Sequence, residues 1–219
     1  MIFYHGSKQV INKPNFKGSN PQNDYGPAFY TTLSIDAAKL WACKNDTVGI
    51  VNKYFVKNEK IKTFKILDLT NKEKYSVLNW IAILMHFRKL SQSFADENEM
   101  VLKWLEKYYL NVENYDLIIG FRADDNYFKF PLRFITNDLS YEDLEEVFMS
   151  GNLGVQYVFT SERAIKSLVF KRNYDCDETF LGKYYSNVKK ASEDFDVLLR
   201  KKRDPKKTYV LDLMRLQDE

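Results

Sequence analysis

Glycine and proline are scarce in this chain of 219 residues, which contains 8 and 5 of them. A β-sandwich with many tight turns, or a chain with long flexible linkers, would use more of both residues. Intrinsic disorder is excluded as well, because 45% of the residues are apolar and 16% are aromatic. The composition therefore indicates one large or two small globular domains with a substantial hydrophobic core.

An excess of either charge is also absent, since 33 basic residues stand against 30 acidic ones for a net charge of +3. Nucleic-acid binding needs a concentrated basic face, which this balance does not predict. Basic residues do gather in segment 200–207, at the end of a charged helical stretch. Because cations favour the C-terminal end of a helix dipole, a solvated helix end explains that cluster better than a nucleic-acid site.

Cysteines and long apolar runs are rare too. Cys43 and Cys176 stand alone without the spacing of metal ligands, so we expect reduced thiols and no metal site. The longest apolar window, residues 77–87, is interrupted by Asn79 and His86 and is too short to span a bilayer. With no recognisable targeting segment, the sequence predicts a cytoplasmic protein that does not enter a membrane.

Hydrophobic periodicity predicts an α+β fold. Apolar, β-branched and aromatic runs predict short strands at residues 1–5, 28–32, 49–56, 61–69, 116–121, 155–160 and 208–213. Apolar residues at helical spacing predict helices at residues 35–44, 75–89, 97–110, 140–151, 162–170 and 186–203. Segments 49–56 and 61–69 are expected to form a β-hairpin. Most strands are not separated by single helices, so we expect a mostly antiparallel or mixed sheet with helices packed around it.

The charged C-terminal part is the candidate for a second unit. Residues 186–219 combine a charged helix with the expected terminal strand, and Asp204-Pro205 breaks the helix between them. We expect this part to pack on the domain that residues 1–185 form.

The first candidate site segment is Tyr4-His5-Gly6-Ser7, at the end of the first predicted strand. The chain has only two histidines, and this one follows an apolar run and precedes glycine and serine. Ligand binding explains a histidine in that position better than packing does, and a buried structural histidine is the alternative.

Two further segments suggest the same kind of site. Residues 24–32 are predicted to form a turn and a short strand directly before a capped helix. The packed helix is expected to fix the position of the Tyr30 side chain. A role in the turn before Gly26 explains Asp24 as well as a role in a binding site does. For Tyr30, the alternative is a place in the core, since the chain has 15 tyrosines. Much later, a predicted strand carries the polar side chain of Gln156.

The order of these segments resembles a bacterial family of unknown function within the ADP-ribosyltransferase superfamily, in the branch that uses a His-Tyr-Glu arrangement. The resemblance covers roughly residues 1–170, with a long unmatched middle. It rests on His5, Gly6, Ser7, Asp24, Tyr25, Gly26, Phe29, Tyr30, Thr32, Ala38, Trp41, Ala42, Gln156, Tyr157, Phe159, Thr160, Ser161 and Glu162. It implies a split, mostly antiparallel sheet and NAD⁺ as the co-substrate.

The resemblance also implies roles for individual residues. His5 corresponds to the histidine that hydrogen-bonds the adenosine ribose, and Gly6 to the glycine whose backbone holds the nicotinamide carboxamide. Tyr30 corresponds to the tyrosine that stacks on the nicotinamide ring, and Ser7 and Asp24 complete the expected cofactor-binding set. These residue types suit the roles, because neutral imidazole donates and accepts, glycine exposes its backbone, and tyrosine offers an aromatic face to a cationic pyridinium.

The third position departs from the family pattern. There a carboxylate binds the nicotinamide ribose and steadies its positive charge as nicotinamide leaves, but this chain has Gln156. Glutamine can hold the sugar but carries no negative charge. Stabilisation by preorganised charge is usually the largest contribution to catalysis. Glu162 lies six residues further, roughly 20 Å along an extended strand, and is rejected as a substitute. Asp124 or Asp125, in a loop after a central strand, is the better candidate. We therefore expect Gln156, Tyr30 and Asp125 to be catalytic.

The resemblance predicts a mono-ADP-ribosyltransferase that transfers a glycosyl group from NAD⁺ to a protein or nucleic acid. It suggests the toxin of a bacterial toxin–antitoxin pair, with an antitoxin protein as a further partner. An NAD⁺ glycohydrolase, and an NAD⁺-binding or interaction module without transferase activity, are the alternatives. If the missing carboxylate limits turnover, Gln156→Glu is expected to raise it. Trp41 and Trp104, at helical spacing, are expected in the core.

Overall fold

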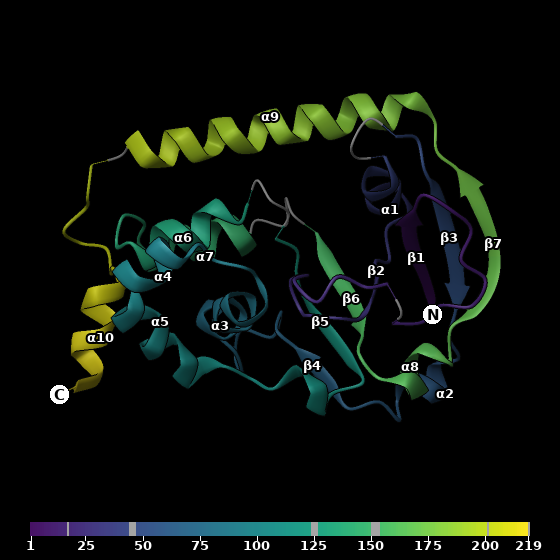
Figure 1. Ribbon diagram of the computed structural model, residues 1–219, viewed down its shortest axis with the longest axis horizontal. Helices are drawn as coiled ribbons and strands as arrows, with labels where there is room; N and C mark the ends of the chain where they lie inside the picture. Colours follow the sequence, from purple (N-terminus) through teal and green to yellow (C-terminus); the bar gives the residue numbers. More distant parts are fainter. Residues whose placement is uncertain (17, 44–46, 124–126, 150–153, 201, 219) are drawn as a thin grey trace.

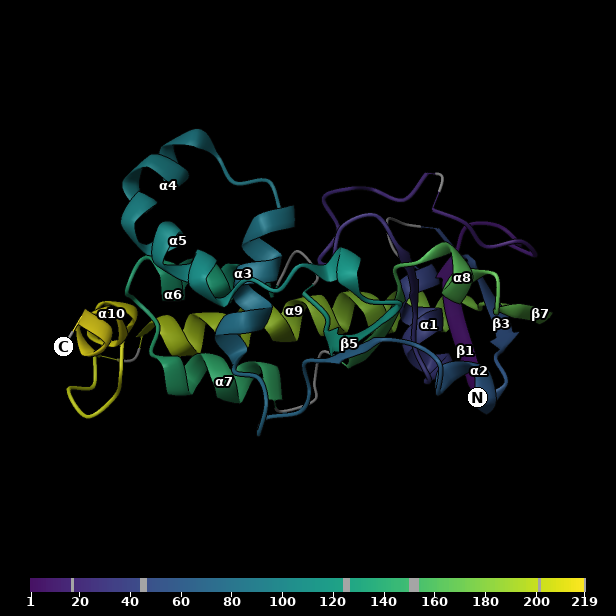
Figure 2. The same ribbon diagram turned by 90° about the horizontal axis from the view of Figure 1, so that it is seen from below.

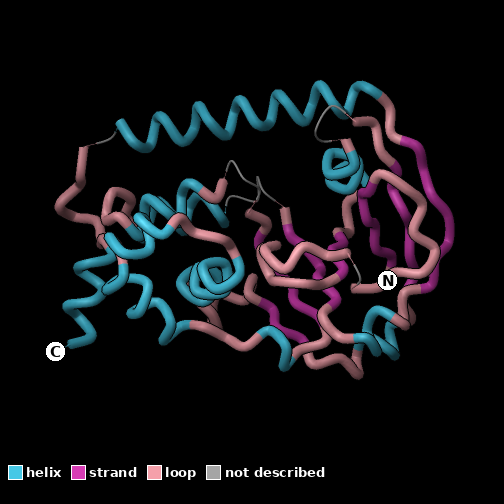
Figure 3. Tube along the Cα trace, in the orientation of Figure 1, coloured by secondary structure: helices cyan, strands magenta, loops and turns pink. Residues whose placement is uncertain are grey.

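The computed structural model describes residues 1–219 except residues 17, 44–46, 124–126, 150–153, 201 and 219. The described part forms two β-sheets with helices around them (Figures 1 and 3). The first sheet has the strand order β1 (Ile2–Ser7), β3 (Ile50–Phe55), β7 (Val169–Asp175). The second has the order β2 (Phe29–Thr31), β6 (Val155–Phe159), β5 (Leu117–Phe121), β4 (Ile66–Asp68). Every pairing in these sheets except the parallel β4–β5 is antiparallel, so the predicted α+β class with mostly antiparallel strands is confirmed.

The two sheets pack against each other through aromatic side chains. Phe3 of β1 meets Phe159 of β6 edge to face, with ring centroids 5.1 Å apart. Phe29 of β2 meets Tyr54 of β3 in the same way at 5.5 Å. All four rings are buried, and the edge-to-face geometry suits the charge distribution of aromatic rings. This core fixes the position of β1 relative to β2 and β6, which carry the candidate site residues.

Helix α1 (Ile35–Ala42) packs on the first sheet beside the candidate site. Ser34 caps it, because its Oγ accepts the backbone N–H of Ala37 at 3.2 Å. The helix comes very close to β1 at Gly6, where an added Cβ would lie 2.2 Å from the carbonyl oxygen of Ala38 and 2.7 Å from the nitrogen of Ala42. Glycine at position 6 is therefore required for packing, whatever else its backbone does.

Replacing Gly6 with alanine is expected to lower the free energy of unfolding by roughly 3 kcal/mol, because the new methyl group would push α1 away from β1. Gly182→Ala is the matched control. No described atom lies within 4 Å of the Cβ position at Gly182, which sits in a long helix, so this change should stabilise the protein by up to about 1 kcal/mol. Urea unfolding of both variants measures the difference. Equal stability of the two would show that α1 can shift at no cost.

The second sheet is flanked by a group of helices (Figures 1 and 2). These are α3 (Val77–Phe87), α4 (Gln92–Glu97), α5 (Glu99–Leu105), α6 (Lys129–Ile135) and α7 (Tyr141–Met149). Trp80 of α3 joins the layers, since its ring contacts Phe121 of β5 and Phe148 of α7 with centroids 6.3 and 4.3 Å apart. Trp104 is buried on α5, as its spacing predicted. Within the described residues, none of the helices combines the length and apolar character needed to cross a membrane.

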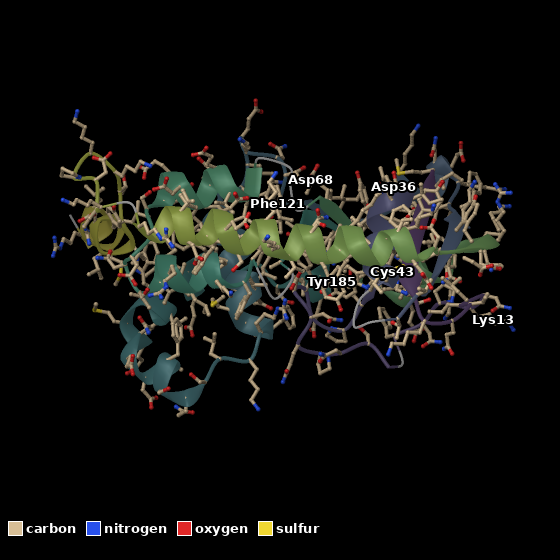
Figure 4. All side chains as sticks on the ribbon, turned by 90° about the horizontal axis from the view of Figure 1, so that it is seen from above. Lys13, Asp36, Cys43, Asp68, Phe121 and Tyr185 are labelled. Atoms are coloured by element: carbon tan, nitrogen blue, oxygen red, sulfur yellow. The ribbon has the colours of Figure 1, made fainter. Side chains whose placement is uncertain are left out.

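Helix α9 (Glu178–Arg200) runs along the outside of the molecule from the first sheet to this group of helices (Figures 1 and 4). At its first end, Phe180 is buried with Cys43 and Cys176, both free thiols. Near its other end, Phe195 meets Phe130 of α6 edge to face at 5.0 Å. The expected domain boundary at residue 185 falls inside this helix, whose described contacts join both parts of the molecule.

The hairpin predicted for segments 49–56 and 61–69 is wrong. Strand β3 pairs with β1 and β7 in the first sheet, whereas β4 pairs with β5 in the second. A short helix, α2 (Asn58–Ile61), lies between them in place of a turn. Periodicity identified both strands but carries no information on which partner each strand takes.

Two further differences lie near the C-terminus. The helix expected at residues 162–170 ends at Ile165 as α8 (Glu162–Ile165), and no element was expected for residues 171–175. Strand β7 occupies Val169–Asp175 instead, with mostly exposed side chains that show no apolar alternation. It forms by pairing with β3 at the sheet edge. The strand predicted at 208–213 is instead α10 (Val210–Asp218), where Asp212 accepts the backbone N–H of Tyr209 at 3.1 Å and so caps the helix start.

Candidate functional site

A pocket lies where β1 and β2 diverge. In the described residues these strands pair at a single bridge, in which Tyr4 and Thr32 exchange backbone hydrogen bonds of 2.8 and 2.9 Å. Continued antiparallel pairing would next join Gly6 to Tyr30. Instead, the imidazole Nδ1 of His5 lies 2.6 Å from the carbonyl oxygen of Tyr30. The His5 side chain thus takes the place of the next backbone bond and separates the strands.

The divergence leaves a space of about 40 Å³, lined by Tyr4, His5, Gly6, Tyr30, Thr31, Thr32, Ala37, Ala38, Trp41, Arg122, Gly154, Val155 and Gln156. A volume of this size holds a few water molecules. A larger ligand therefore needs an outward shift of the lining side chains. Each of the three sequence segments proposed as a site contributes to the lining, although up to about 150 residues separate them along the chain.

The protonation of His5 follows from its partner. A carbonyl oxygen only accepts, so Nδ1 must carry the proton, and the neutral ring has its lone pair on Nε2. Burial lowers the pKa of His5 below its ordinary value, while the bond to Tyr30 opposes this shift. The ring also stacks on Phe29, with centroids 4.5 Å apart. His5 is therefore a fixed, neutral hydrogen-bond acceptor at neutral pH.

The backbone of Gly6 faces the pocket for a geometric reason. Successive residues of a strand direct their N–H and C=O groups to alternate sides. Tyr4 directs both groups to Thr32 of the neighbouring strand segment, so Gly6 directs its own groups to the same side, where β2 has already diverged. An amide donor and an amide acceptor therefore lie next to His5 at the wall of the pocket.

Tyr30 is fixed through its hydroxyl group. The hydroxyl donates to the carbonyl oxygen of Gly26 at 2.6 Å and accepts the backbone N–H of Tyr25 at 3.1 Å. Burial raises the pKa of Tyr30 far above its ordinary value, so the phenol stays neutral. The polar end of the side chain is thus held by the 24–26 turn, and Tyr30 is one of the residues that line the pocket.

Gln156 is held by Asp24, which lies behind the pocket wall. The Nε2 of Gln156 donates to the carboxylate of Asp24 at 3.0 Å. An ionised carboxylate only accepts, so the amide group must point there, and Oε1 is left to face the pocket. Both side chains are buried. The glutamine thus presents an oriented acceptor, with a negative charge one hydrogen bond behind it.

Asp24 collects three hydrogen-bond donors. Besides Gln156, its carboxylate accepts the backbone N–H of Ala123 at 2.9 Å and the guanidinium of Arg88 at 3.1 Å. Burial raises the pKa of Asp24, whereas Arg88, Ala123 and Gln156 favour the ionised form. Because every partner is placed to donate, we assign Asp24 as ionised at neutral pH.

Trp41 and Arg122 are pocket residues that sequence reasoning missed. Trp41 was expected in the core, but it is half-buried and lines the pocket beside Ala37 and Ala38 of the same helix. The guanidinium of Arg122 lies over its indole ring, 3.9 Å from the centroid. Helical spacing showed correctly that Trp41 lies on an inward face of α1 but not that this face borders a pocket.

The structure separates some other candidates from the pocket. The Ser7 hydroxyl donates to the carbonyl oxygen of Gln9 at 2.5 Å and accepts from Asn52 at 2.9 Å, so it organises the loop after β1. Glu162 is exposed at the start of α8 (Glu162–Ile165), where it pairs with Lys166 at 2.7 Å. Asp124 and Asp125 lie outside the described residues.

Comparison with known protein families identifies the family of this chain. A family model described as "Protein of unknown function (DUF3990)" matches residues 1–170, and the chain therefore belongs to this family. The matched region includes every described residue that lines the pocket, whereas α9 and α10 lie beyond it. No curated protein and no solved structure matches the chain significantly.

Proposed function

We propose that this member of the DUF3990 family binds NAD⁺ where β1 and β2 diverge and transfers its ADP-ribose group to a macromolecule. One observation carries the proposal: the three segments that resemble ADP-ribosyltransferases border a single pocket. Their polar groups are oriented toward it by contacts that a packing role alone would not require.

The proposed nicotinamide end of the site consists of Gly6 and Tyr30. The carboxamide of nicotinamide has one donor group and one acceptor, which match the free-facing backbone C=O and N–H groups of Gly6. Tyr30 lines the same pocket, and the aromatic face of a tyrosine attracts a cationic pyridinium. The carboxamide is present in both redox forms, but the aromatic face favours the oxidised dinucleotide, whose nicotinamide ring is cationic, over the reduced form, whose ring is neutral.

The proposed ribose contacts are made by two oriented acceptors, Nε2 of His5 and Oε1 of Gln156. Sugar hydroxyls are donors that suit both. In the reaction, the bond between C1′ of the ribose and the nicotinamide nitrogen breaks, and nicotinamide leaves as a neutral molecule with the bonding electron pair. A nucleophile of the acceptor then bonds to C1′ and releases its proton to solvent.

Asp24 supplies the negative charge that the sequence appeared to lack. Positive charge develops on the ribose as nicotinamide leaves, and a fixed carboxylate nearby stabilises it. Asp24 acts through the Gln156 amide, which polarises Oε1 toward the pocket. We also propose that the activity belongs to a toxin with an antitoxin protein as its partner, as the resemblance suggests.

Two other functions remain testable alternatives. A pocket of about 40 Å³ admits water readily, which favours hydrolysis of NAD⁺ as the variant reaction. Glutamine in the usual carboxylate position favours a module that binds NAD⁺ without turning it over.

Replacement of His5 by alanine tests the proposal. We expect it to weaken NAD⁺ binding by about 10- to 100-fold, because the acceptor is lost and Tyr30 loses its hydrogen bond. His86→Ala is the matched control, since this histidine stacks on Tyr109 outside the pocket and should not affect binding. The assay incubates purified protein with labelled NAD⁺ and cell lysate, and calorimetry measures binding.

The products distinguish the alternatives. Label on protein or nucleic acid that disappears in His5→Ala supports transfer. Free nicotinamide without labelled macromolecules supports hydrolysis, and saturable binding without turnover supports the binding module. Absence of both binding and turnover in the parent protein would overturn the proposal.

A further inference from the structure

We infer that Arg122, stacked on Trp41, binds the phosphate groups of the ligand, so that the pocket selects a dinucleotide or another pyrophosphate-bearing nucleotide. This inference rests on the proposed function for the identity of the ligand as NAD⁺. The phosphate chemistry itself follows from the contacts described below and can be tested separately.

The backbone on both sides of Arg122 is held firmly in place. The carbonyl oxygen of Phe121 accepts the hydroxyl of Tyr25 at 2.8 Å and the indole N–H of Trp80 at 3.2 Å. On the other side, Ala123 donates its N–H to Asp24 at 2.9 Å. Its carbonyl oxygen accepts from Arg88 at 2.5 Å. These bonds fix the end of β5, and the side chain between them lines the pocket.

Arg122 also determines the charge of the pocket. Among the described lining residues it carries the only full charge at neutral pH, because His5 is neutral and the others are uncharged. The carboxylate of Asp24 lies behind Gln156, is bonded to Arg88 and also attracts the charge of Arg122. An anionic group entering the pocket therefore meets a cation first.

The stacking with Trp41 gives this cation a defined orientation. The guanidinium carbon lies 3.9 Å from the centroid of the indole ring. The planar donor fork of an arginine can bind two oxygens of one phosphate. The indole also excludes water from one face of the guanidinium, which strengthens its hydrogen bonds to an anion. Lysine in the same position would lack this paired geometry.

The experiment compares two ligands that differ in phosphate content. Calorimetry measures ADP-ribose, which has a pyrophosphate, and nicotinamide riboside, which has no phosphate, on the full chain and on Arg122→Ala. We expect the variant to bind ADP-ribose about 10- to 100-fold more weakly and nicotinamide riboside within about twofold of the parent. The affinity of Arg122→Lys for ADP-ribose should lie between those of the parent and of Arg122→Ala. Arg122→Lys serves as the test if Arg122→Ala does not fold.

Arg172→Ala is the matched control, because Arg172 also stacks on an aromatic ring, that of Tyr174 at 4.8 Å, but on the exposed strand β7. It should change neither affinity. Unchanged ADP-ribose binding in Arg122→Ala, or an equal loss for both ligands, overturns the inference even when NAD⁺ binds as proposed. Conversely, ADP-ribose binding that depends on Arg122, without any NAD⁺ binding, supports the phosphate site and overturns the proposed function.

Discussion

Replacing Asp24 with alanine is expected to lower the free energy of unfolding by about 3–5 kcal/mol, the largest stability effect that the structure predicts. The carboxylate has an exposed fraction of only 7% and its partner Arg88 one of 20%. Its removal takes the carboxylate away from the Arg88 charge, the Ala123 N–H and the Gln156 amide. For a chain of this size, the loss corresponds to a fall of roughly 10 °C in the melting temperature.

Two variants separate this effect from a general loss of charge. Glu193→Ala removes one partner of the exposed Lys189 pair on α9 and should cost no more than about 0.5 kcal/mol. Arg88→Met in the Asp24→Ala background should recover part of the loss, because no uncompensated buried charge remains. Urea unfolding measures all of them. If Asp24→Ala costs no more than Glu193→Ala, the buried network does not hold the site together.

Gln156→Leu is expected to lower kcat/KM for NAD⁺ by roughly 100-fold, the largest effect on activity. Leucine has a similar size but neither the acceptor that faces the pocket nor the amide that reaches Asp24. The matched control is Gln92→Leu, which breaks a similar glutamine–aspartate bond of 2.7 Å to Asp96 on the exposed helix α4. It should leave kcat/KM unchanged. An equal loss in both variants, or in neither, would contradict the role of Gln156.

The kcat/KM of Gln156→Glu for NAD⁺ is expected to stay within a few-fold of the parent value near neutral pH. This expectation replaces the increase in turnover that the sequence suggested. The introduced carboxyl would lie about 3 Å from Asp24, and two carboxyl groups that close share one proton. The protonated group then donates to Asp24 and turns its carbonyl oxygen to the pocket, as the glutamine amide does.

This variant should also show a new pH dependence of stability. The like charge of Asp24 raises the pKa of the introduced carboxyl above its value in the unfolded chain. Its contribution to stability is therefore full at low pH and is lost as the pH rises through the folded-state pKa. Urea unfolding and kcat/KM from about pH 5 to about pH 9 measure it. Higher turnover than the parent without such a dependence would show that the two groups do not share a proton.

The sequence determined the local elements of this protein and the segments of its pocket. Ser34 and the apolar spacing after it specify α1, and the apolar run at 117–121 specifies a buried strand, because caps and periodicity act over a few residues. His5 was identifiable because a histidine followed by glycine is a poor choice for a strand end that only packs. The motif order also predicted that Tyr30 and Gln156 would share a site with it.

Only the tertiary structure decided how those segments act together. Asp24 and Gln156 are 132 residues apart, and their hydrogen bond arises from the pairing of β2, β5 and β6, which periodicity does not specify. The same pairing places Arg122 on Trp41 and turns a residue expected in the core into part of the pocket wall. The local sequence shows which residues are polar, whereas long-range packing determines which of them lie within hydrogen-bonding distance. The lack of a carboxylate at position 156 was therefore visible in the sequence, but the hydrogen bond from Gln156 to Asp24 was not.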